Sequence, residues 1–145
     1  MILVSSALEL VINNINKMNN LIIDAASDKI FLTLIVNNDV YTCSHDNSKN
    51  NFEKLIILIN KFLNKNQSSI NVIDRIYVNR GPGSFAGIRN SLSIVKGLFL
   101  AKKIDYYCFS FEDFGKLKEI KYEDVPNFCD KFKIKKNLLN LLYLS

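Results

Sequence analysis

The stretch RIYVNRGPGSFAGIRNSLSIVKGLFLAKK, residues 75–103, decides the fold of this chain. An apolar run at 75–79 predicts a β-strand, and the glycine-proline turn after it leads into a predicted helix at 84–103. A second apolar run at 105–109 predicts another strand, so the region reads as a β-α-β unit. Its two strands should be parallel and its crossover right-handed, which places the chain in the α/β class.

Three apolar runs upstream of this unit predict a meander of short strands. They cover residues 21–24, 30–36 and 40–43. The last two runs are separated by residue types that tolerate the positive φ angles of a tight hairpin turn, namely Asn37, Asn38 and Asp39. Strands joined by such a turn are antiparallel, whereas the strands of the β-α-β unit are parallel. The sequence therefore predicts a mixed sheet.

A helix is predicted between the meander and the β-α-β unit. Apolar residues recur there at helical spacing through Asn64, namely Phe52, Leu55, Ile56, Ile59, Phe62 and Leu63. Either Asn50 or Asn51 is expected to cap its start. The unbroken apolar run at 55–59 gives this helix more apolar surface than contact with one sheet requires.

The helix at 84–103 shows the same excess of apolar surface. One stripe along it consists of Phe85, Ile88, Leu92, Val95 and Phe99. A second stripe beside it consists of Gly87, Ser91, Ile94, Leu98 and Ala101. A helix on one side of a sheet needs a single apolar face about 100° wide, so the second stripe predicts another packing partner. That partner is either a second protein or the terminal segments of the chain itself.

If the partner is a second protein, the two apolar helices form a patch that fits two further helices. The residues then expected at the interface are Leu55, Ile56, Ile59, Ser91, Ile94, Leu98 and Ala101. A charge placed at Ile94 or Leu98 is expected to leave the fold intact and to abolish pairing.

Length and composition indicate one globular domain. The sequence has 145 residues, of which 48% are hydrophobic and 23% charged. No stretch reaches the roughly 18 apolar positions of a membrane-spanning helix, and no basic start of a secretory signal is present. We therefore expect a cytoplasmic protein without membrane contact. The expected divisions are an extension at 1–19, with a short helix at Leu8, Val11, Ile12 and Ile15, a lobe at 20–114 and a Lys-rich tail at 115–145.

Few residues offer chemistry. Cys43, Cys108 and Cys129 are odd in number and lack a CxxC pair, so free thiols are expected. His45 is the only histidine, which leaves no metal site and no Ser/His/Asp or Cys/His catalytic set, and we expect no catalytic residues. The formal charge of +5 comes mostly from scattered Lys. Without a basic block, this surplus is interpreted as solvated surface rather than an RNA-binding site.

The glycine turn matches no common nucleotide motif. Gly81, Gly83 and Gly87 are spaced G-x-G-x-x-x-G, one residue longer than the dinucleotide fingerprint, and the Lys-Ser/Thr of a P-loop is missing. Two interpretations remain open. The turn is either an architectural element that leads into a helix capped by Ser84, or an anion site at that helix N-terminus.

The segment GPGSFAGIRNSLSIVKGLFLA resembles the hallmark of the TsaB (YeaZ) family of bacterial threonylcarbamoyladenosine-biosynthesis proteins. The matching residues are Gly81, Pro82, Gly83, Ser84, Phe85, Gly87 and Arg89. Ala86 replaces the usual Thr, and Asn90-Ser91 replace an apolar-Gly pair. The strand at 21–24 resembles the family's opening strand, although Ala25 and Ala26 lack its hydroxyls. The likeness covers about residues 20 to 114.

The resemblance implies an actin/Hsp70-like (ASKHA) fold of the ribonuclease H type, present here as a single truncated lobe. It also implies a non-catalytic subunit that pairs with and activates a TsaD-like threonylcarbamoyltransferase through the two apolar helices. A TsaE-like ATPase is an additional expected partner, homodimerisation through the same helices is expected when the chain is alone, and contact with tRNA is expected to be indirect. Under this reading the glycine turn is architectural.

The alternative implied by the same fold is an autonomous nucleotide-binding enzyme or sensor. Asp24 and Ser27 would then lie on the nucleotide side, with Asp24 directing a metal; capping the hairpin is an equal alternative for that carboxylate. The loss of hydroxyls at Ala25 and Ala26 disfavours independent ATP chemistry. We expect no cofactor of the chain's own, which leaves ATP or ADP a place only at a joint between subunits.

Overall fold

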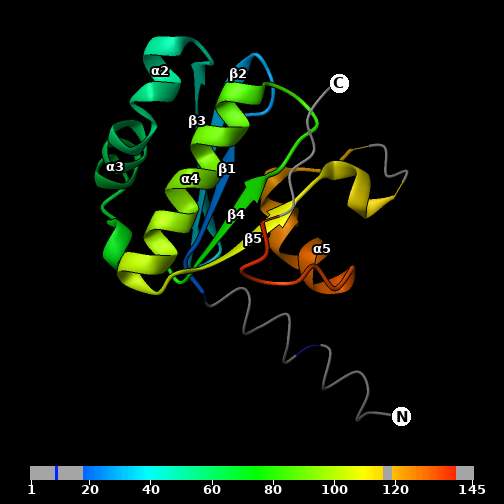
Figure 1. Cartoon of the computed structure of the whole chain (residues 1–145). Coiled ribbons are helices and arrows are strands. Elements are labelled where there is room, and N and C mark those ends of the chain that lie inside the picture. Colours follow the sequence, from blue (N-terminus) through cyan, green and yellow to red (C-terminus); the bar gives the residue numbers. More distant parts are fainter. Residues whose placement is uncertain (1–8, 10–17, 116–118, 140–145) are drawn as a thin grey trace, which may run out of the picture.

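A mixed five-stranded sheet forms the centre of the fold in a computed structural model of the chain (Figure 1). The structure describes residues 9, 18–115 and 119–139, so the helix predicted at Leu8, Val11, Ile12 and Ile15 lies outside the described residues. The strand order is β3-β2-β1-β4-β5. The strands are β1 (Asn20–Asp24), β2 (Lys29–Val36), β3 (Asp39–Asp46), β4 (Arg75–Asn79) and β5 (Asp105–Phe109).

The pairing of the strands confirms the predicted mixed sheet. β1 pairs antiparallel with β2, and β2 pairs antiparallel with β3. On its other side β1 pairs parallel with β4, which in turn pairs parallel with β5. All five residues of β1 are buried, because this central strand has a neighbour on each side and side chains packed on both faces.

The β2–β3 hairpin turns through two asparagines, as their residue type predicted. Asn37 has a φ of 51° and Asn38 a φ of 69°. Two central residues with positive φ make the turn whose twist matches that of the flanking strands. Asp39 is not a turn residue but the first residue of β3, where it pairs with Val36.

Three helices cover one face of the sheet: α2 (Lys49–Glu53), α3 (Leu55–Lys65) and α4 (Phe85–Lys102). The single helix predicted at 52–64 is wrong, because the chain leaves helical geometry at Lys54, with φ −106° and ψ 23°. The predicted caps are wrong as well. Ser48 holds the N-cap position of α2, and Asn51 instead donates from Nδ2 to the Asp46 carbonyl oxygen at 2.8 Å. Asn51 thereby ties α2 to the end of β3.

The larger core lies between the sheet and these three helices. Its fully buried side chains come from β1, β2 and β4 below and from α3 and α4 above, and they include Leu21, Leu32, Leu55, Ile59, Val78, Ile88 and Val95. The half-buried Ile94 and Leu98 of α4 pack against the same core. Cys108 contributes a buried thiol that is in no disulfide, as predicted.

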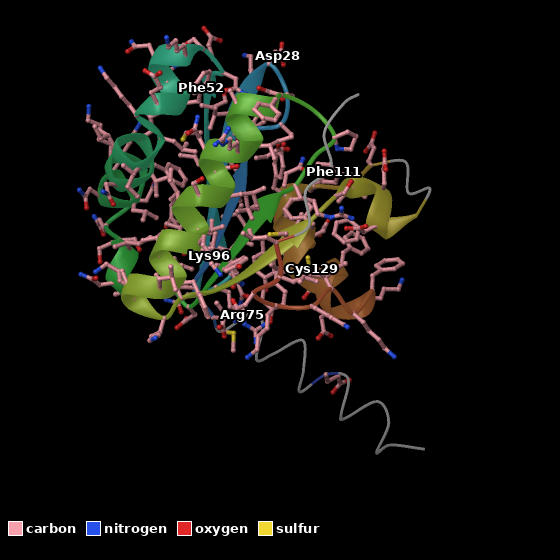
Figure 2. The ribbon with its side chains drawn as sticks, viewed as in Figure 1. Asp28, Phe52, Arg75, Lys96, Phe111 and Cys129 are labelled. Atoms are coloured by element: carbon pink, nitrogen blue, oxygen red, sulfur yellow. The ribbon has the colours of Figure 1, made fainter. Side chains whose placement is uncertain are left out.

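A second, aromatic core covers the opposite face of the sheet. It joins Tyr77 and Phe109 of the sheet to Phe114, which ends a short 3-10 helix η2 (Phe111–Phe114), and to Val125 and Cys129 of α5 (Val125–Lys131). Another 3-10 turn, η3 (Tyr122–Asp124), precedes α5. Cys129 and Phe111 lie on this side in Figure 2, whereas Phe52 and Lys96 lie on the side of α4. The sheet is thus sandwiched between two layers.

The segment after α5 returns to the outer edge of β5. Lys136 forms an isolated antiparallel bridge with Tyr107, and Asn137 accepts from the Tyr106 N–H at 2.9 Å through Oδ1 and donates to the Tyr106 carbonyl oxygen at 2.7 Å. Residues expected only to form a Lys-rich tail therefore close one edge and one face of the sheet. Within the described ranges, no helix combines the length and apolarity needed to cross a bilayer.

Candidate functional site

The glycine turn is wedged against the turn between β1 and β2. The peptide bond from Gly81 to Pro82 is cis, and φ is 101° at Gly81 and 157° at Gly83. A Cβ added to Gly83 would lie 2.0 Å from the Ala26 carbonyl oxygen. A Cβ added to Gly87, one turn into α4, would lie 2.1 Å from the Ala25 carbonyl oxygen. These two glycines are needed because backbone passes where a side chain would stand.

Three backbone donors in and after this turn, those of Gly81, Ser84 and Gly87, bind acceptors of the protein itself. Gly81 donates its N–H to Asn79 Oδ1 at 2.9 Å, and Ser84 donates its N–H to the Ala26 carbonyl oxygen at 2.7 Å. The Ser84 hydroxyl caps α4 by accepting from the Gly87 N–H at 3.3 Å, as predicted. An anion at the helix start would compete with these contacts. The geometry therefore favours the architectural interpretation.

The remaining motif residues face outward. The Phe85 side chain is 54% exposed and lies under the Arg89 guanidinium, whose central carbon is 6.0 Å from the ring centroid. Pro82 and Arg89 are exposed as well. These positions at the start of α4 are available for contact with another molecule.

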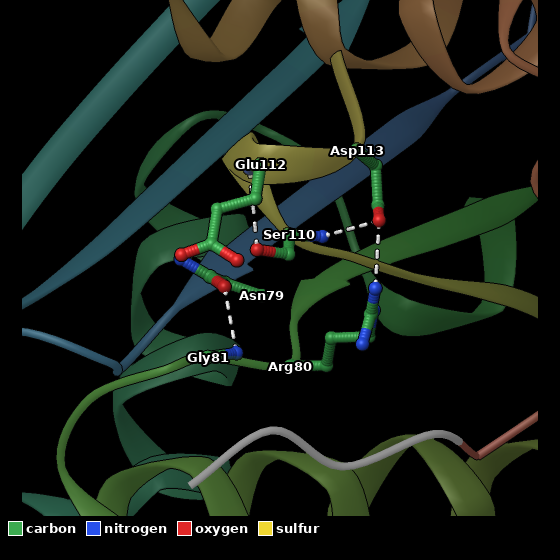
Figure 3. A network of polar contacts seen from close by, with 6 residues as sticks. All are labelled: Asn79, Arg80, Gly81, Ser110, Glu112 and Asp113. Atoms are coloured by element: carbon green, nitrogen blue, oxygen red, sulfur yellow. Dashed lines mark hydrogen bonds and ion pairs between the residues drawn. The ribbon is translucent and has the colours of Figure 1, made fainter. Parts of the chain in front are cut away.

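An ion pair beside the turn ties β4 to the segment after β5 (Figure 3). Arg80 contacts Asp113 Oδ1 at 2.7 Å, and both side chains are largely buried, with 11% and 21% exposure. Asp113 Oδ2 also accepts from the Ser110 N–H at 2.9 Å, and Ser110 Oγ accepts from the Glu112 N–H at 3.3 Å. This capping box fixes η2 and so holds the carboxylate in place for Arg80.

Asp24 does not present its carboxylate to solvent. The residue is 4% exposed; Oδ1 accepts from the Ala26 N–H at 3.0 Å, and Oδ2 accepts from the Tyr122 hydroxyl at 2.6 Å. Ser27 is exposed, and its hydroxyl donates to the Lys29 carbonyl oxygen at 3.2 Å. Asp24 thus caps the turn between β1 and β2, which was the alternative to directing a metal in the sequence analysis. Among the described residues no group of three or more His, Cys, Asp or Glu could hold a metal ion.

The predicted partner interface needs correction at three positions. Leu55, Ile59 and Ser91 are 0% exposed, because they face the sheet and fill the core of this chain. They cannot contact a partner in this conformation. Ile94 and Leu98 are half-buried against the same core, so a charge there would disturb the fold, contrary to the expectation above.

An apolar surface still spans α3 and α4. Ile56 is 38% exposed, Ala101 is exposed, and Ile94 and Leu98 are half-buried. We call these four residues the α3–α4 surface. Ala101 follows Leu98 by three residues and Ile94 by seven, so the α4 members share one flank of the helix. The other flank of α4 borders a hollow of about 400 Å³ that is lined by Arg89, Ser93, Lys96, Leu100 and Leu139.

Sequence reasoning missed two features of these surfaces. Tyr122 was not singled out, since its partner Asp24 is 98 residues away and no local pattern indicates the contact. Leu100 at 62% and Ile57 at 48% are also exposed apolar residues of the two helices, more so than Ile56 at 38%. Only the apolar run at 55–59 and the apolar end of the helix at 84–103 signalled them.

Comparison with known proteins finds partial matches to proteins of threonylcarbamoyladenosine biosynthesis. The model of a family described as "TsaD: tRNA N6-adenosine threonylcarbamoyltransferase" matches residues 45–110. The tRNA threonylcarbamoyladenosine biosynthesis protein TsaB of Buchnera aphidicola subsp. Baizongia pistaciae is 29% identical over 83 residues, which are 57% of this chain and 38% of that protein. The chain is therefore similar to proteins of the TsaB (YeaZ) family.

Solved structures of TsaB-family proteins share the fold. YeaZ from Pseudomonas aeruginosa superposes with a TM-score of 0.60 at 20% identity, over 64% of this chain and 44% of YeaZ. A Pseudomonas aeruginosa protein described as similar to peptidase YEAZ also gives 0.60 at 20% identity, over 64% of this chain and 43% of its own. The mixed sheet with its helices is thus the ASKHA-type, ribonuclease H-like fold that the resemblance implied. The chain spans less than half the length of these relatives.

Proposed function

We propose that this chain acts in tRNA threonylcarbamoyladenosine biosynthesis as a non-catalytic subunit that pairs with and activates a TsaD-like threonylcarbamoyltransferase. Similarity to the Buchnera TsaB protein supports the pathway, since that relative is named for it. The observation that carries the pairing is the α3–α4 surface, where Ile56 and Ala101 stand in solvent beside the half-buried Ile94 and Leu98. Apolar side chains gathered over two helices fit a helix pair of another subunit.

The contacts that Asp24 and the glycine turn already make within the chain support an accessory role. Both oxygens of Asp24 are occupied by protein donors, and the glycine turn uses its N–H groups on Asn79 and Ala26. The alternative of an autonomous nucleotide enzyme would need these groups released. ATP or ADP, if bound, would then lie at an interface between subunits. A TsaE-like ATPase could dock at the same interface. Contact with tRNA would be made by the partner subunit.

Co-purification with the TsaD-like subunit of the same organism tests this function. Ile56→Glu and Ala101→Glu place a charge on the α3–α4 surface at exposed positions, so the fold should survive while pairing weakens at least about tenfold, or about 1.4 kcal/mol. Leu100→Glu is the matched control, because it adds the same charge one residue away on the other flank of α4. Failure of the unaltered chain to co-purify would reject the proposed function. Equal pairing by all three variants would place the interface elsewhere.

The same variants address homodimerisation through these helices. When the chain is alone, self-association through the α3–α4 surface should fall in Ile56→Glu and Ala101→Glu but not in Leu100→Glu. Sedimentation velocity over a concentration series measures this.

A further inference from the structure

The outer edge of β3 carries backbone groups that no other strand uses. In a two-residue hairpin the residues flanking the turn form a hydrogen-bonded pair, here Val36 with Asp39. Alternate residues of β3 from Asp39 onward therefore bond to β2. The residues between them, Val40, Thr42 and Ser44, point their N–H and C=O groups away from the sheet. Within the described part of the chain, no backbone hydrogen bond reaches these three.

This edge lacks the features that keep edge strands from pairing. Proteins commonly protect an edge with Pro, Lys, a bulge or a covering loop. The register of β3 with β2 is continuous over all eight residues, and the strand, DVYTCSHD, contains neither Pro nor Lys. Asp39 and Asp46 stand only at its ends. The middle of β3 is thus a long, regular and open edge.

A hollow of about 160 Å³ lies beside the same edge, between side chains of β3 and α3. Cys43 and His45 of β3 form one wall, with Cys43 Sγ 3.8 Å from His45 Nε2. Leu58 and Phe62 of α3 supply apolar surface, and the exposed Lys61 and Lys65 stand at the rim. Burial raises the pKa of the Cys43 thiol, while the Lys65 charge acts in the opposite direction. A positive charge therefore lies close to the hollow.

We propose that the β3 edge binds an extended acidic segment of another protein as an added strand. Val40, Thr42 and Ser44 would supply its backbone hydrogen bonds, which give affinity in this mode of recognition. Alternate side chains of the added strand would face α3. A small apolar one opposite Cys43 fits the hollow, and carboxylates on either side of it meet Lys61 and Lys65. This surface is separate from the α3–α4 surface, so the inference goes beyond the proposed function.

Charge argues for a foreign segment rather than a second copy. In a β3-to-β3 pair the side chains facing α3 would be Asp39, Tyr41, Cys43 and His45, and their single carboxylate, that of Asp39, stands at the hairpin end of the strand rather than beside Cys43. Such a pair would also bring Lys61 and Lys65 of both copies to the same side of the joined sheet, where like charges repel. An acidic strand brings the opposite charge to both lysines.

A synthetic peptide provides the probe: acetyl-Thr-Glu-Thr-Val-Thr-Glu-Thr-amide, labelled for fluorescence anisotropy against the full chain at low ionic strength. We expect saturable binding, weakened at least about tenfold when both Glu are replaced by Lys. The double variant Lys61→Glu with Lys65→Glu should invert this preference. Lys96→Glu, which changes charge on α4 instead, should keep it. Equal binding of the acidic and basic peptides by the unaltered chain would overturn the proposal.

Backbone pairing is tested separately. Thr42→Pro removes an outward N–H that no β2 bond needs, so the fold should remain and peptide binding should fall. Should this variant unfold, methylation of the peptide provides the same test. Methyl groups on the peptide N–H groups that face β3 should abolish binding, and those on the alternate N–H groups should not. Equal binding of the two methylated peptides overturns the proposal. The proposal is also overturned if the unaltered chain forms a dimer and the Thr42→Pro variant is a monomer, because the β3 edge would then pair with a second copy.

Discussion

The Tyr122 hydroxyl donates a hydrogen bond of 2.6 Å to Asp24 Oδ2, joining two residues 98 positions apart. Asp24 ends β1, the central strand, while Tyr122 belongs to the segment that covers the aromatic face of the sheet. The bond therefore connects the centre of the lobe to its C-terminal layer.

Replacement of Tyr122 by Phe should destabilise the protein. The ring contacts with Phe31 and Phe111 remain possible, with centroids at 5.5 and 5.9 Å, but a buried carboxylate loses its donor. A hydrogen bond to a charged group is worth about 1.5–3 kcal/mol. Urea denaturation should report a loss in this range for Tyr122→Phe. A change below about 0.5 kcal/mol would mean that solvent replaces the hydroxyl and that Asp24 is accessible.

Stability should decline at alkaline pH, beginning with Cys129. Burial raises the pKa of this thiol above its ordinary 9.0, and Asp113 and Cys108 act in the same direction. The folded protein then holds the proton more tightly than the unfolded chain. This contribution is complete below about pH 9 and is lost as the pH rises beyond it, by up to about 1.4 kcal/mol per pH unit.

Tyr77 and Tyr122 should extend this decline from about pH 10. Burial raises the pKa of both phenols above their ordinary 10.0; the Asp24 charge adds to the effect at Tyr122, and Arg75 opposes it at Tyr77. Free energies of unfolding measured across the alkaline range check the sign. Cys129→Val should reduce the slope that begins near pH 9 and leave the part that the Cys43 thiol contributes. An unchanged slope in that variant would contradict the assignment.

Alanine substitutions at two glycines of α4 should change stability in opposite directions, because backbone from another segment lies close to only one of them. Gly87→Ala puts a methyl group 2.1 Å from the Ala25 carbonyl oxygen and 2.8 Å from Asn47 Nδ2, so the β1–β2 turn must move. We expect a cost of about 1–3 kcal/mol. Gly97→Ala is the control in the same helix, because nothing lies within 4 Å of the added carbon. That variant should gain about 0.5–1 kcal/mol. Thermal unfolding distinguishes the two signs.

Local patterns were sufficient to predict most of the sheet. The apolar runs at 21–24 and 75–79 differ from β1 and β4 by one residue at most, and the asparagine turn was evident because Asn tolerates positive φ. The boundaries failed where a side chain had a tertiary role. Asn51 was assigned to a cap by residue type, yet it bonds to the end of β3, a contact that helical periodicity does not encode.

In the candidate site, too, features set by local pattern were predictable and features set by tertiary contacts were not. Ser84 as a cap follows from its place before a helical pattern. Two apolar stripes along α4 do not tell which of its faces meets the sheet. Ser91 is buried even though it is polar, because its hydroxyl donates to the Ile88 carbonyl oxygen at 2.9 Å. The need for glycine at Gly83 and Gly87 depends on two carbonyls from the distant β1–β2 turn.

The second face of the sheet was missed because its cover is built from single turns. η2, η3 and α5 are four, three and seven residues long, too short for a periodic pattern, and their aromatic residues stand at irregular intervals. What joins them is tertiary: Phe114 stacks on Phe109 at 5.9 Å and on Phe128 at 5.4 Å between ring centroids. The domain boundary expected after residue 114 would pass directly through this cluster.

Phe114→Ala should therefore destabilise the whole fold rather than loosen a tail. The side chain is 1% exposed, and truncating a buried Phe costs about 3–5 kcal/mol. Phe85→Ala is the matched control on the opposite layer; that ring is 54% exposed and lies under Arg89, so its loss should cost less than about 1 kcal/mol. Urea denaturation followed by Tyr fluorescence and by far-UV circular dichroism should give one coincident transition for Phe114→Ala, shifted to lower urea. Two separated transitions, or a cost equal to that of Phe85→Ala, would mean that residues after 114 fold as an independent appendage and that the boundary is real.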